Sequence, residues 1–277
     1  MSRKRILILF HENSTRLSIR NSLVLAYVPV WKSMGHGVEV QFGINSTPNA
    51  DLVFVHIDMS VVPKDYLEFA NQFPVSINAR VADIRKSSIS NNLLCSTDSW
   101  SGPVVVKSNL NFGGWPEYLI DYPSRFGRNA NTRYMLGKTM SAIGVWRKHV
   151  PNWTRTYRIF DDLTGVPKEV FLDDKLVVEK FLPETDNDYF CMRMFQCLGD
   201  RHDCLKLYSK NPFIKYGEEG LAQLIEPHPE ILRFREKLSL DYGKIDYVVH
   251  NGVPHVLDVN KTVGTSGGSK PDKTRIE

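Results

Sequence analysis

The stretch DYGKIDYVVHNGVPHVLDVN, residues 241–260, consists of two apolar segments on either side of Asn251–Gly252. An Asn-Gly pair in this position is a strong signal for a β-hairpin, because both residues tolerate the positive φ angles of a two-residue turn. Side chains alternate along a strand, so Asp258 and Asn260 point to the same face. Folding the strands back at the turn brings Asp246 near this pair. The sequence therefore predicts a hairpin that gathers two carboxylates and an amide.

These polar side chains lie in strands that are otherwise apolar, and buried polar groups need partners. Carboxylate and amide oxygens suit Mg²⁺ held between protein and phosphates. Carboxylates on one hairpin repel each other without a cation, which favours a metal site over the alternative, in which Asp258 caps the turn at Lys261–Thr262. Lys244 precedes Asp246 by two residues and points to the same face, where it could stabilise an oxyanion.

The composition limits the classes of protein to consider. The chain has 277 residues, 42% of them hydrophobic and 24% charged, which is ordinary for a soluble enzyme. Its net charge of +4 is too small to indicate nucleic-acid binding. The apolar run at Ile6–Phe10 is too short for a signal-peptide core or a membrane span, and four scattered cysteines suit a reducing compartment. We therefore expect a cytoplasmic protein with no nucleic-acid partner and no membrane partner.

The first part of the chain alternates between apolar strand patterns and helical patterns. The segments RILILF, MGHGVEVQFG, DLVFVHI and VSINA read as strands, and a segment from about residue 18 to 33 and PKDYLEFANQF read as helices. Strands separated by helices imply a parallel sheet covered on both faces. No G-x-G-x-x-G follows the first strand, which excludes a dinucleotide fingerprint. We expect this α/β block to end near residue 85.

A second polar site follows in GPVVVKSNLNFGG, residues 102–114. An apolar strand ends at Lys107 and continues into a loop with Asn109, Asn111, Gly113 and Gly114. Small loop residues let backbone N–H groups approach an anion closely, so this segment could hold a polyphosphate. The alternative is a hairpin with a lysine at the end of a strand.

The segment KLVVEKFLPE, residues 175–184, is an extended segment that offers both polar and apolar groups. Its strand runs into Glu179, and the backbone beyond can present N–H and C=O groups to an adenine edge, while Phe181 and Leu182 supply apolar walls. Glu184 follows where a carboxylate could accept hydrogen bonds from ribose. An amphipathic edge strand with a charged end is the alternative.

In this order, the three segments resemble the ATP-grasp superfamily, which includes D-alanine–D-alanine ligase, glutathione synthetase and glutamate-adding ligases. The resemblance implies a mixed α/β fold in which two α+β subdomains grip ATP behind an N-terminal parallel-sheet domain. The implied boundaries are 1–85 for the N-terminal domain, 86–184 for a central or lid subdomain that ends in the adenine hinge, 185–264 for a C-terminal subdomain with the metal hairpin, and 265–277 for a flexible tail.

The resemblance also implies roles for single residues. Lys107 would bind the α/β phosphates, Glu179 with the backbone of Lys180 and Leu182 would hold adenine, and Glu184 would take ribose. The Mg²⁺ ligands, with Mn²⁺ as an alternative ion, would be Asp246, Asp258 and Asn260. INARVADIRK matches the segment where relatives place an earlier phosphate lysine, here Lys86, and DNDYFCMRMF matches a strand whose arginine often meets phosphate or substrate, here Arg193.

The chain departs from the superfamily pattern at three points. Relatives usually have glutamate where this chain has Asp258, so the carboxylate is one methylene shorter. Their N-x-x-P-G turn is here Asn260-Lys261-Thr262-Val263-Gly264, without the proline. The distance along the chain from Lys86 to Lys107 is also short.

The implied reaction passes the γ-phosphoryl group of ATP to a carboxylate, and an amine or thiol then displaces phosphate from the acylphosphate. Arg193 and Lys244 would be the catalytic cations, and residues 109–114 and 209–220 are candidate lids. Two alternatives stay open: a kinase of this superfamily that phosphorylates a small molecule or protein, and a non-catalytic ATP-binding module. The expected partners are small-molecule or peptide carboxylate and amine substrates, and a homodimer stays open.

Overall fold

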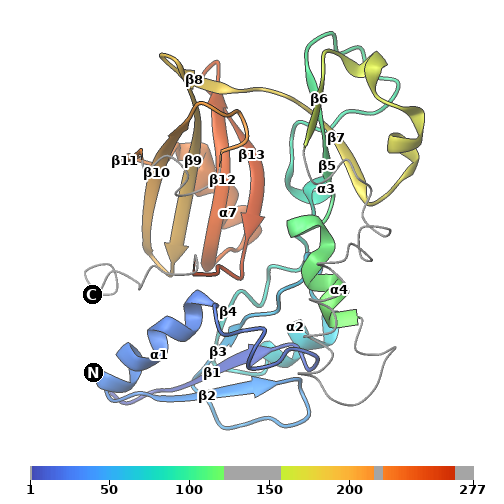
Figure 1. Cartoon of the computed structure of the whole chain (residues 1–277). Helices are drawn as coiled ribbons and strands as arrows, with labels where there is room; N and C mark the ends of the chain where they lie inside the picture. Colours follow the sequence, from blue (N-terminus) through green and yellow to red (C-terminus); the bar gives the residue numbers. More distant parts are fainter. Residues whose placement is uncertain (1, 122–156, 215–220, 266–277) are drawn as a thin grey trace. The chain divides into compact units, whose positions relative to one another are not determined.

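The computed structural model describes residues 2–121, 157–214 and 221–265 (Figure 1). These residues form two compact units. The first contains residues 2–82, 115–121 and 261–265, and the second contains residues 83–114, 157–214 and 221–260. The predicted boundaries at 85, 184 and 264 stay predictions. Residues 215–220 of the second candidate lid and 266–277 of the predicted tail lie outside the described residues.

The first unit is built on a four-stranded parallel sheet, as the alternating pattern predicts. The strand order is β2-β1-β3-β4, and the strands are β1 (Arg5–Phe10), β2 (Gly37–Phe42), β3 (Leu52–Val55) and β4 (Val75–Ile77). The helices are α1 (Leu23–Ser33), α2 (Lys64–Ala70) and α4 (Trp115–Asp121). Helix α1 begins at Leu23, later than the predicted start near residue 18.

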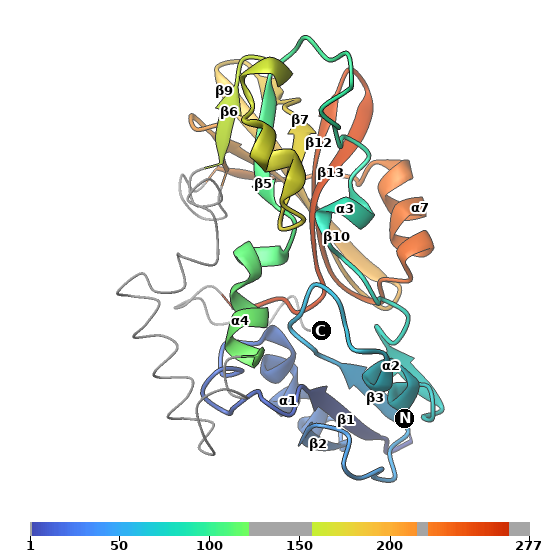
Figure 2. The same ribbon diagram turned by 90° about the vertical axis from the view of Figure 1, so that its right-hand side faces the viewer.

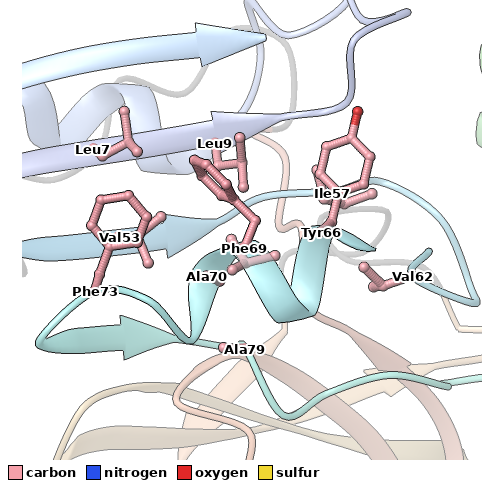
Figure 3. Packing of buried hydrophobic residues seen from close by; sticks show 11 residues of the cluster. Leu7, Leu9, Val53, Ile57, Val62, Tyr66, Phe69, Ala70, Phe73 and Ala79 are labelled. Carbon is pink, nitrogen blue, oxygen red and sulfur yellow. The ribbon is translucent and has the colours of Figure 1, made fainter. Parts of the chain in front are cut away.

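Helices cover both faces of this parallel sheet. On one face, Leu7 and Val53 pack against Phe69 of α2 and Phe73 just after it (Figure 3). On the other face, the ring of Trp31 in α1 lies 6.3 Å from the ring of Phe54, measured between centroids. Neighbouring residues of a strand point to opposite faces, so Val53 and Phe54 anchor different helices. The predicted two-sided covering is therefore confirmed.

The second unit contains a three-stranded antiparallel sheet of order β6-β5-β7. Its strands are β5 (Val104–Ser108), β6 (Arg158–Phe160) and β7 (Leu176–Lys180), and its short helix is α3 (Lys86–Ile89). Short 3₁₀ segments lie at Leu163–Gly165 and Lys168–Leu172, and Asn111–Gly114 is an irregular turn with positive φ angles at Phe112 and Gly113. Val104, Val106 and Val178 are buried with Phe160 and Leu163 in a small core on one side of the sheet.

The same unit holds a six-stranded sheet of order β11-β10-β9-β12-β13, with β8 also paired to β9. The strands are β8 (Glu184–Asp186), β9 (Tyr189–Leu198), β10 (Arg201–Ser209), β11 (Ala222–Leu224), β12 (Tyr242–His250) and β13 (Val253–Asn260). Helix α7 (Pro229–Leu238) precedes β12, and α3 lies beside β13 (Figure 2).

The hairpin of β12 and β13 forms at the predicted turn. Asn251 and Gly252 have φ angles of 52° and 79°, as a turn of this kind requires. From the turn, the pairing runs regularly to Tyr247, which faces Val256, and then shifts by one residue. Beyond the shift, Asp246 faces Asp258.

The two faces of the six-stranded sheet carry different side chains. The Asp246 face carries Asp246 and Asp258, with Met194 of β9 opposite Asp246. The Tyr247 face carries Tyr247 and, opposite it on β9, Arg193. Helix α7 lies on the Tyr247 face, because the N–H of its N-cap residue His228 donates to the Tyr247 hydroxyl at 3.2 Å. Among the described residues, no helix is both long enough and apolar enough to cross a lipid bilayer.

Candidate nucleotide and metal site

The hairpin brings the predicted oxygen ligands together on the Asp246 face. Asp246 and Asp258 are direct cross-strand partners, and Lys244 and Asn260 form the next pair on the same face. Each carboxylate receives a lysine: Lys244 Nζ donates to Asp246 Oδ2 at 2.7 Å, and Lys86 Nζ donates to Asp258 Oδ1 at 3.0 Å. Two facing acids are therefore held by two cations from different parts of the unit.

Burial makes this acid pair unusual. Burial raises the pKa of Asp246, and the nearby charge of Asp258 raises it further, against the effect of Lys244. Asp246 Oδ1 is buried and has no hydrogen-bond partner within the part of the chain that the structure describes. Burial opposes the charged form of Lys244, but Asp246 and Asp258 outweigh it and raise the pKa of that lysine. An unsatisfied oxygen in such a place indicates a missing ligand.

Lys86, on α3, lies at the centre of the candidate site. Its residue surface is only 4% exposed, and its Nζ lies 3.4 Å from Asn111 Oδ1 in addition to its bond with Asp258. Burial opposes its charge, yet Asp258 and, more weakly, Glu179 raise its pKa. The sequence predicts a phosphate lysine at Lys86, and the structure places this residue directly against Asp258, a predicted metal ligand.

The candidate phosphate loop after β5 is held mainly by its asparagines. Asn109 accepts from the N–H of Ser87 at 2.9 Å and donates to the carbonyl of Asp174 at 2.9 Å. Asn111 donates to the carbonyl of Val259 at 2.6 Å, which ties the loop to β13. The φ angles of Gly113 and Gly114 are 67° and 76°, a conformation that suits glycine. The amides of Asn109 and Asn111 therefore support the loop and its tie to β13, and anion binding at Gly113 and Gly114 stays a prediction.

Lys107 and Glu179 form a buried ion pair across β5 and β7. Lys107 Nζ lies 2.7 Å from Glu179 Oε2, and the two side chains are 11% and 1% exposed. The other oxygen, Glu179 Oε1, is buried without a hydrogen-bond partner among the described residues. The pair leaves one hydrogen-bond acceptor free at the position where the sequence predicts the adenine hinge.

Two backbone N–H groups of the hinge after β7 are hydrogen-bonded to carbonyl groups within the same unit. The N–H of Lys180 donates to the carbonyl of Asn92 and the N–H of Phe181 donates to the carbonyl of Pro103, both at 2.9 Å. Of the backbone groups predicted to contact adenine, the N–H of Lys180 is thus already bonded within the unit, and the carbonyl of Lys180 and the N–H of Leu182 stay the predicted contacts. The ring of Phe213 lies 6.4 Å from that of Phe181 and 5.5 Å from that of Tyr157, so aromatic side chains line this end of the unit.

Glu184 and Arg193 are bound to each other on the Tyr247 face. Arg193 Nε donates to both carboxylate oxygens of Glu184 at 3.1 Å, a second guanidinium N–H donates at 2.9 Å, and the N–H of Val249 adds a bond of 2.7 Å. Arg193 lies opposite Tyr247, whereas Asp246 lies opposite Met194. The structure therefore does not bring Arg193 or Glu184 to the acid pair, and their predicted phosphate and ribose contacts stay predictions.

Sequence reasoning missed two polar residues of the Asp246 face, Gln196 and Asp203. Gln196 of β9 faces Lys244 on one side and Asp203 of β10 on the other. The signal was available in part, because Gln196 has the same strand parity as Met192 and Met194. The pairing of β9 with β10 and β12 supplies the rest.

The donor set fits Mg²⁺. Two carboxylates and an amide oxygen are hard ligands, and the orphaned Asp246 Oδ1 provides an acceptor that no described group satisfies. No group of three or more His, Cys, Asp or Glu side chains could hold a metal ion within the described residues. The set is thus of the kind that leaves several coordination positions to water or phosphate oxygens.

The fold and the site define a mixed α/β protein with a lysine–glutamate pair on one antiparallel sheet and an acid-and-amide hairpin on another. No protein-family model and no curated protein matches the sequence. Among solved structures, the chain is similar to D-alanine–D-alanine ligase from Bacillus anthracis complexed with ATP: the identity is 12%, the TM-score is 0.46, and the match covers 98% of this chain and 91% of that one.

A second similar structure is a RiPP-associated ATP-grasp ligase from Chryseobacterium gregarium in complex with ADP and a leader and core peptide. The identity is 10%, the TM-score is 0.46, and the match covers 94% of this chain and 90% of that one. A third similar structure is a RimK-domain ATP-grasp protein from Sphaerobacter thermophilus. The identity is 11%, the TM-score is 0.43, and the match covers 93% of this chain and 92% of that one. These likenesses are distant in sequence and loose in superposition, so we base the proposed function on the residues of this chain.

Proposed function

We propose that the protein is an ATP-grasp ligase that uses ATP and Mg²⁺ to activate a carboxylate as an acylphosphate and joins it to an amine or thiol. The observation that carries this proposal is the facing pair of Asp246 and Asp258, held by Lys244 and Lys86. Acids and lysines interleaved in this way suit a metal polyphosphate, whose negative oxygens need cations and whose metal needs anions.

Each part of the second unit has a task in this reaction. The hinge carbonyl of Lys180 and the N–H of Leu182 would hold the adenine edge. Lys107 and Lys86 would bind phosphate oxygens, because an ammonium group forms charge-assisted hydrogen bonds with them. Bound by Asp246, Asp258 and Asn260, Mg²⁺ would neutralise charge on the transferring phosphoryl group.

Lys244 would serve the second half of the reaction. Attack of an amine on an acylphosphate carbonyl places negative charge on the carbonyl oxygen, and a fixed cation beside that oxygen lowers the barrier. Lys244 is held at Asp246 by a bond of 2.7 Å, so its ammonium group is positioned before substrate arrives. Phosphoryl transfer itself needs in-line positioning more than covalent help from the protein.

The test has a binding stage and a turnover stage. Mg–ATP, but not NAD or a flavin, should raise the melting temperature of the protein, since a ligand that binds the folded state stabilises it. A library of carboxylates and amines should then release phosphate from ATP only when one of each is present, and mass spectrometry should find the condensed product. A phosphorylated product from one substrate alone would indicate a kinase instead, and no shift with Mg–ATP would contradict the proposal.

A further inference from the structure

A row of polar side chains crosses four strands of the Asp246 face. The cross-strand partners are Asp203 of β10 with Gln196 of β9, Gln196 with Lys244 of β12, and Lys244 with Asn260 of β13. Directly opposed residues of antiparallel strands have Cβ atoms about 5 Å apart. The row therefore continues the acid-and-amide site across the sheet, away from the hairpin, to Gln196 and Asp203.

The outer half of this row contains one carboxylate oxygen without a described partner and one weak hydrogen bond. Asp203 Oδ1 is buried without a hydrogen-bond partner among the described residues. The side-chain amide of Gln196 donates to the sulfur of Met194 at 3.7 Å, and a thioether is a weak acceptor. A buried carboxylate oxygen without a described partner, beside an amide whose hydrogen bond goes to a weak acceptor, indicates a ligand at this pair.

The local charges select the chemistry of that ligand. Lys244 is bonded to Asp246 and Lys86 is bonded to Asp258, so neither lysine neutralises Asp203. Arg201, two residues earlier on the same strand, is exposed to solvent. A group with several N–H donors and a positive charge would satisfy the carboxylate and the carboxamide together, and an ammonium group has these properties.

The position of Gln196 along β9 indicates which reactant Gln196 and Asp203 would contact. Cys191 faces Glu184, just after the hinge, Met194 faces Asp246, and Gln196 lies two residues further on. At about 3.4 Å per residue, Gln196 lies about 7 Å beyond the acid pair on the side away from the hinge. A nucleotide that extends from the hinge to the acid pair leaves this side to the groups that react with its terminal phosphoryl.

We propose that Asp203 and Gln196 bind the ammonium group of the amine substrate. The inference rests on the proposed ligase function and adds to it the site at which one substrate is recognised. Asp203 binds the ammonium form and has no covalent role; the nitrogen releases one proton to water before it attacks the acylphosphate as the free amine. The acceptor is accordingly a compound that carries a protonated amine, such as an amino acid or the free amino end of a peptide.

The test compares Asp203→Asn with a matched control, Asp200→Asn. Both changes remove one carboxylate charge, but Asp200 is exposed in the turn between β9 and β10. The probes are the standard amino acids and small peptides that support phosphate release with Mg–ATP. Asp203→Asn should raise the half-saturating amine concentration by about tenfold or more, the size of one lost charged hydrogen bond. Asp200→Asn should leave it unchanged, and both variants should bind Mg–ATP like the wild type.

Two further measurements separate recognition from a structural role. Hydroxylamine is largely uncharged at neutral pH and traps acylphosphates without an ammonium site, so its reaction rate should be equal in Asp203→Asn and wild type. Asp203→Asn should melt no lower than wild type, because it removes the charge from a carboxylate that has one buried oxygen without a partner among the described residues. Gln196→Met should weaken amine binding in the same direction by a smaller factor.

The outcomes distinguish this inference from the function on which it rests. An amide product with an unchanged half-saturating amine concentration in Asp203→Asn would overturn the inference and leave the ligase intact. A lower melting temperature with equal loss of ATP binding and hydroxylamine reaction would also overturn it, since Asp203 would then support the fold. Absence of any ATP-dependent condensed product would contradict the ligase function itself and the amine site with it.

Discussion

The buried carboxylates on the two faces of the six-stranded sheet differ in how completely they are hydrogen-bonded. On the Tyr247 face, Glu184 receives the N–H groups of the Arg193 fork and the N–H of Val249, so both of its oxygens are bonded. On the Asp246 face, Asp246 keeps one oxygen without a described partner and faces a second acid, Asp258. Glu184 lies on β8 and Asp246 on β12, two strands of the same sheet.

The difference teaches how to separate a structural carboxylate from one that awaits a ligand. A buried charge with every lone pair satisfied is complete within the fold, and removing its partner destabilises the protein. A buried charge with a free oxygen beside a like charge raises the energy of the ligand-free protein, which folding tolerates where a ligand later compensates. Four variants test this distinction, from the largest expected effect to the smallest.

Asp258→Asn should separate activity from stability most strongly. The change keeps size and one oxygen but removes a charge that the metal needs, so we expect ATP turnover to fall by about 1000-fold. The melting temperature should change little, because the lost bond to Lys86 is offset by less repulsion with Asp246. Turnover and melting are measured on the same preparation, with Asp186→Asn as a control on β8. Retained turnover would identify Asp258 as a turn-capping residue instead.

Glu184→Gln should do the reverse: it should lower stability and leave ATP turnover nearly unchanged. Loss of the charge leaves the guanidinium of Arg193 partly buried without its counter-ion, and breaking such a pair costs about 3 kcal/mol of unfolding free energy. Urea denaturation measures this loss, while turnover per folded molecule stays near the wild-type value. A variant of normal stability with strongly reduced nucleotide affinity would restore the predicted ribose role of Glu184.

Lys107→Met should weaken Mg–ATP binding by about 10- to 30-fold, the contribution of a charge-assisted contact with phosphate. The change also leaves Glu179 unpaired at 1% exposure, so it should lower stability as well. Adding Glu179→Gln should restore stability without restoring the contribution of the lysine to affinity. Calorimetric titration of both variants decides the point, and unchanged ATP affinity in the single variant would make Lys107 an ordinary strand residue.

Arg193→Lys should have the smallest effect. Lysine keeps the charge but loses the planar fork that reaches both oxygens of Glu184, which costs about 1 kcal/mol of stability. Because Arg193 lies on the face opposite the acid pair, ATP turnover should stay within about twofold. A large fall in turnover at unchanged stability would show that Arg193 reaches phosphate after all.

Local patterns in the sequence predict much of this arrangement. The alternation of the first block is confirmed as a parallel sheet, and the Asn251–Gly252 turn is confirmed as a hairpin turn. Both rest on signals within a few residues, where propensity and periodicity act. Mixed α/β architecture follows from the same signals.

Contacts between distant segments explain what the sequence leaves undetermined. Alternation shows that Arg193 and Met194 point to opposite faces, but only the pairing of β9 with β12 shows which of them joins Asp246. The bond between Lys86 and Asp258 joins segments that share no local pattern. Gln196 and Asp203 are recognisable as a pair only once β10 is placed beside β9.

The register shift in the hairpin decides which face of the sheet Asp258 occupies. Continued without interruption from the turn, the ladder would set Asp246 against Leu257 and Ile245 against Asp258, which would direct Asp258 to the side of α7. The extra residue in β13 reverses this. Deletion of Leu257 would remove the bulge and leave a regular ladder in which Asp246 still faces Asp258, so the acid pair would keep its face of the sheet. A ladder that paired Leu257 with Asp246 would instead turn both Asp258 and Asn260 to the side of α7, so the bulge, and not the identity of Leu257, keeps the two ligands on the Asp246 face.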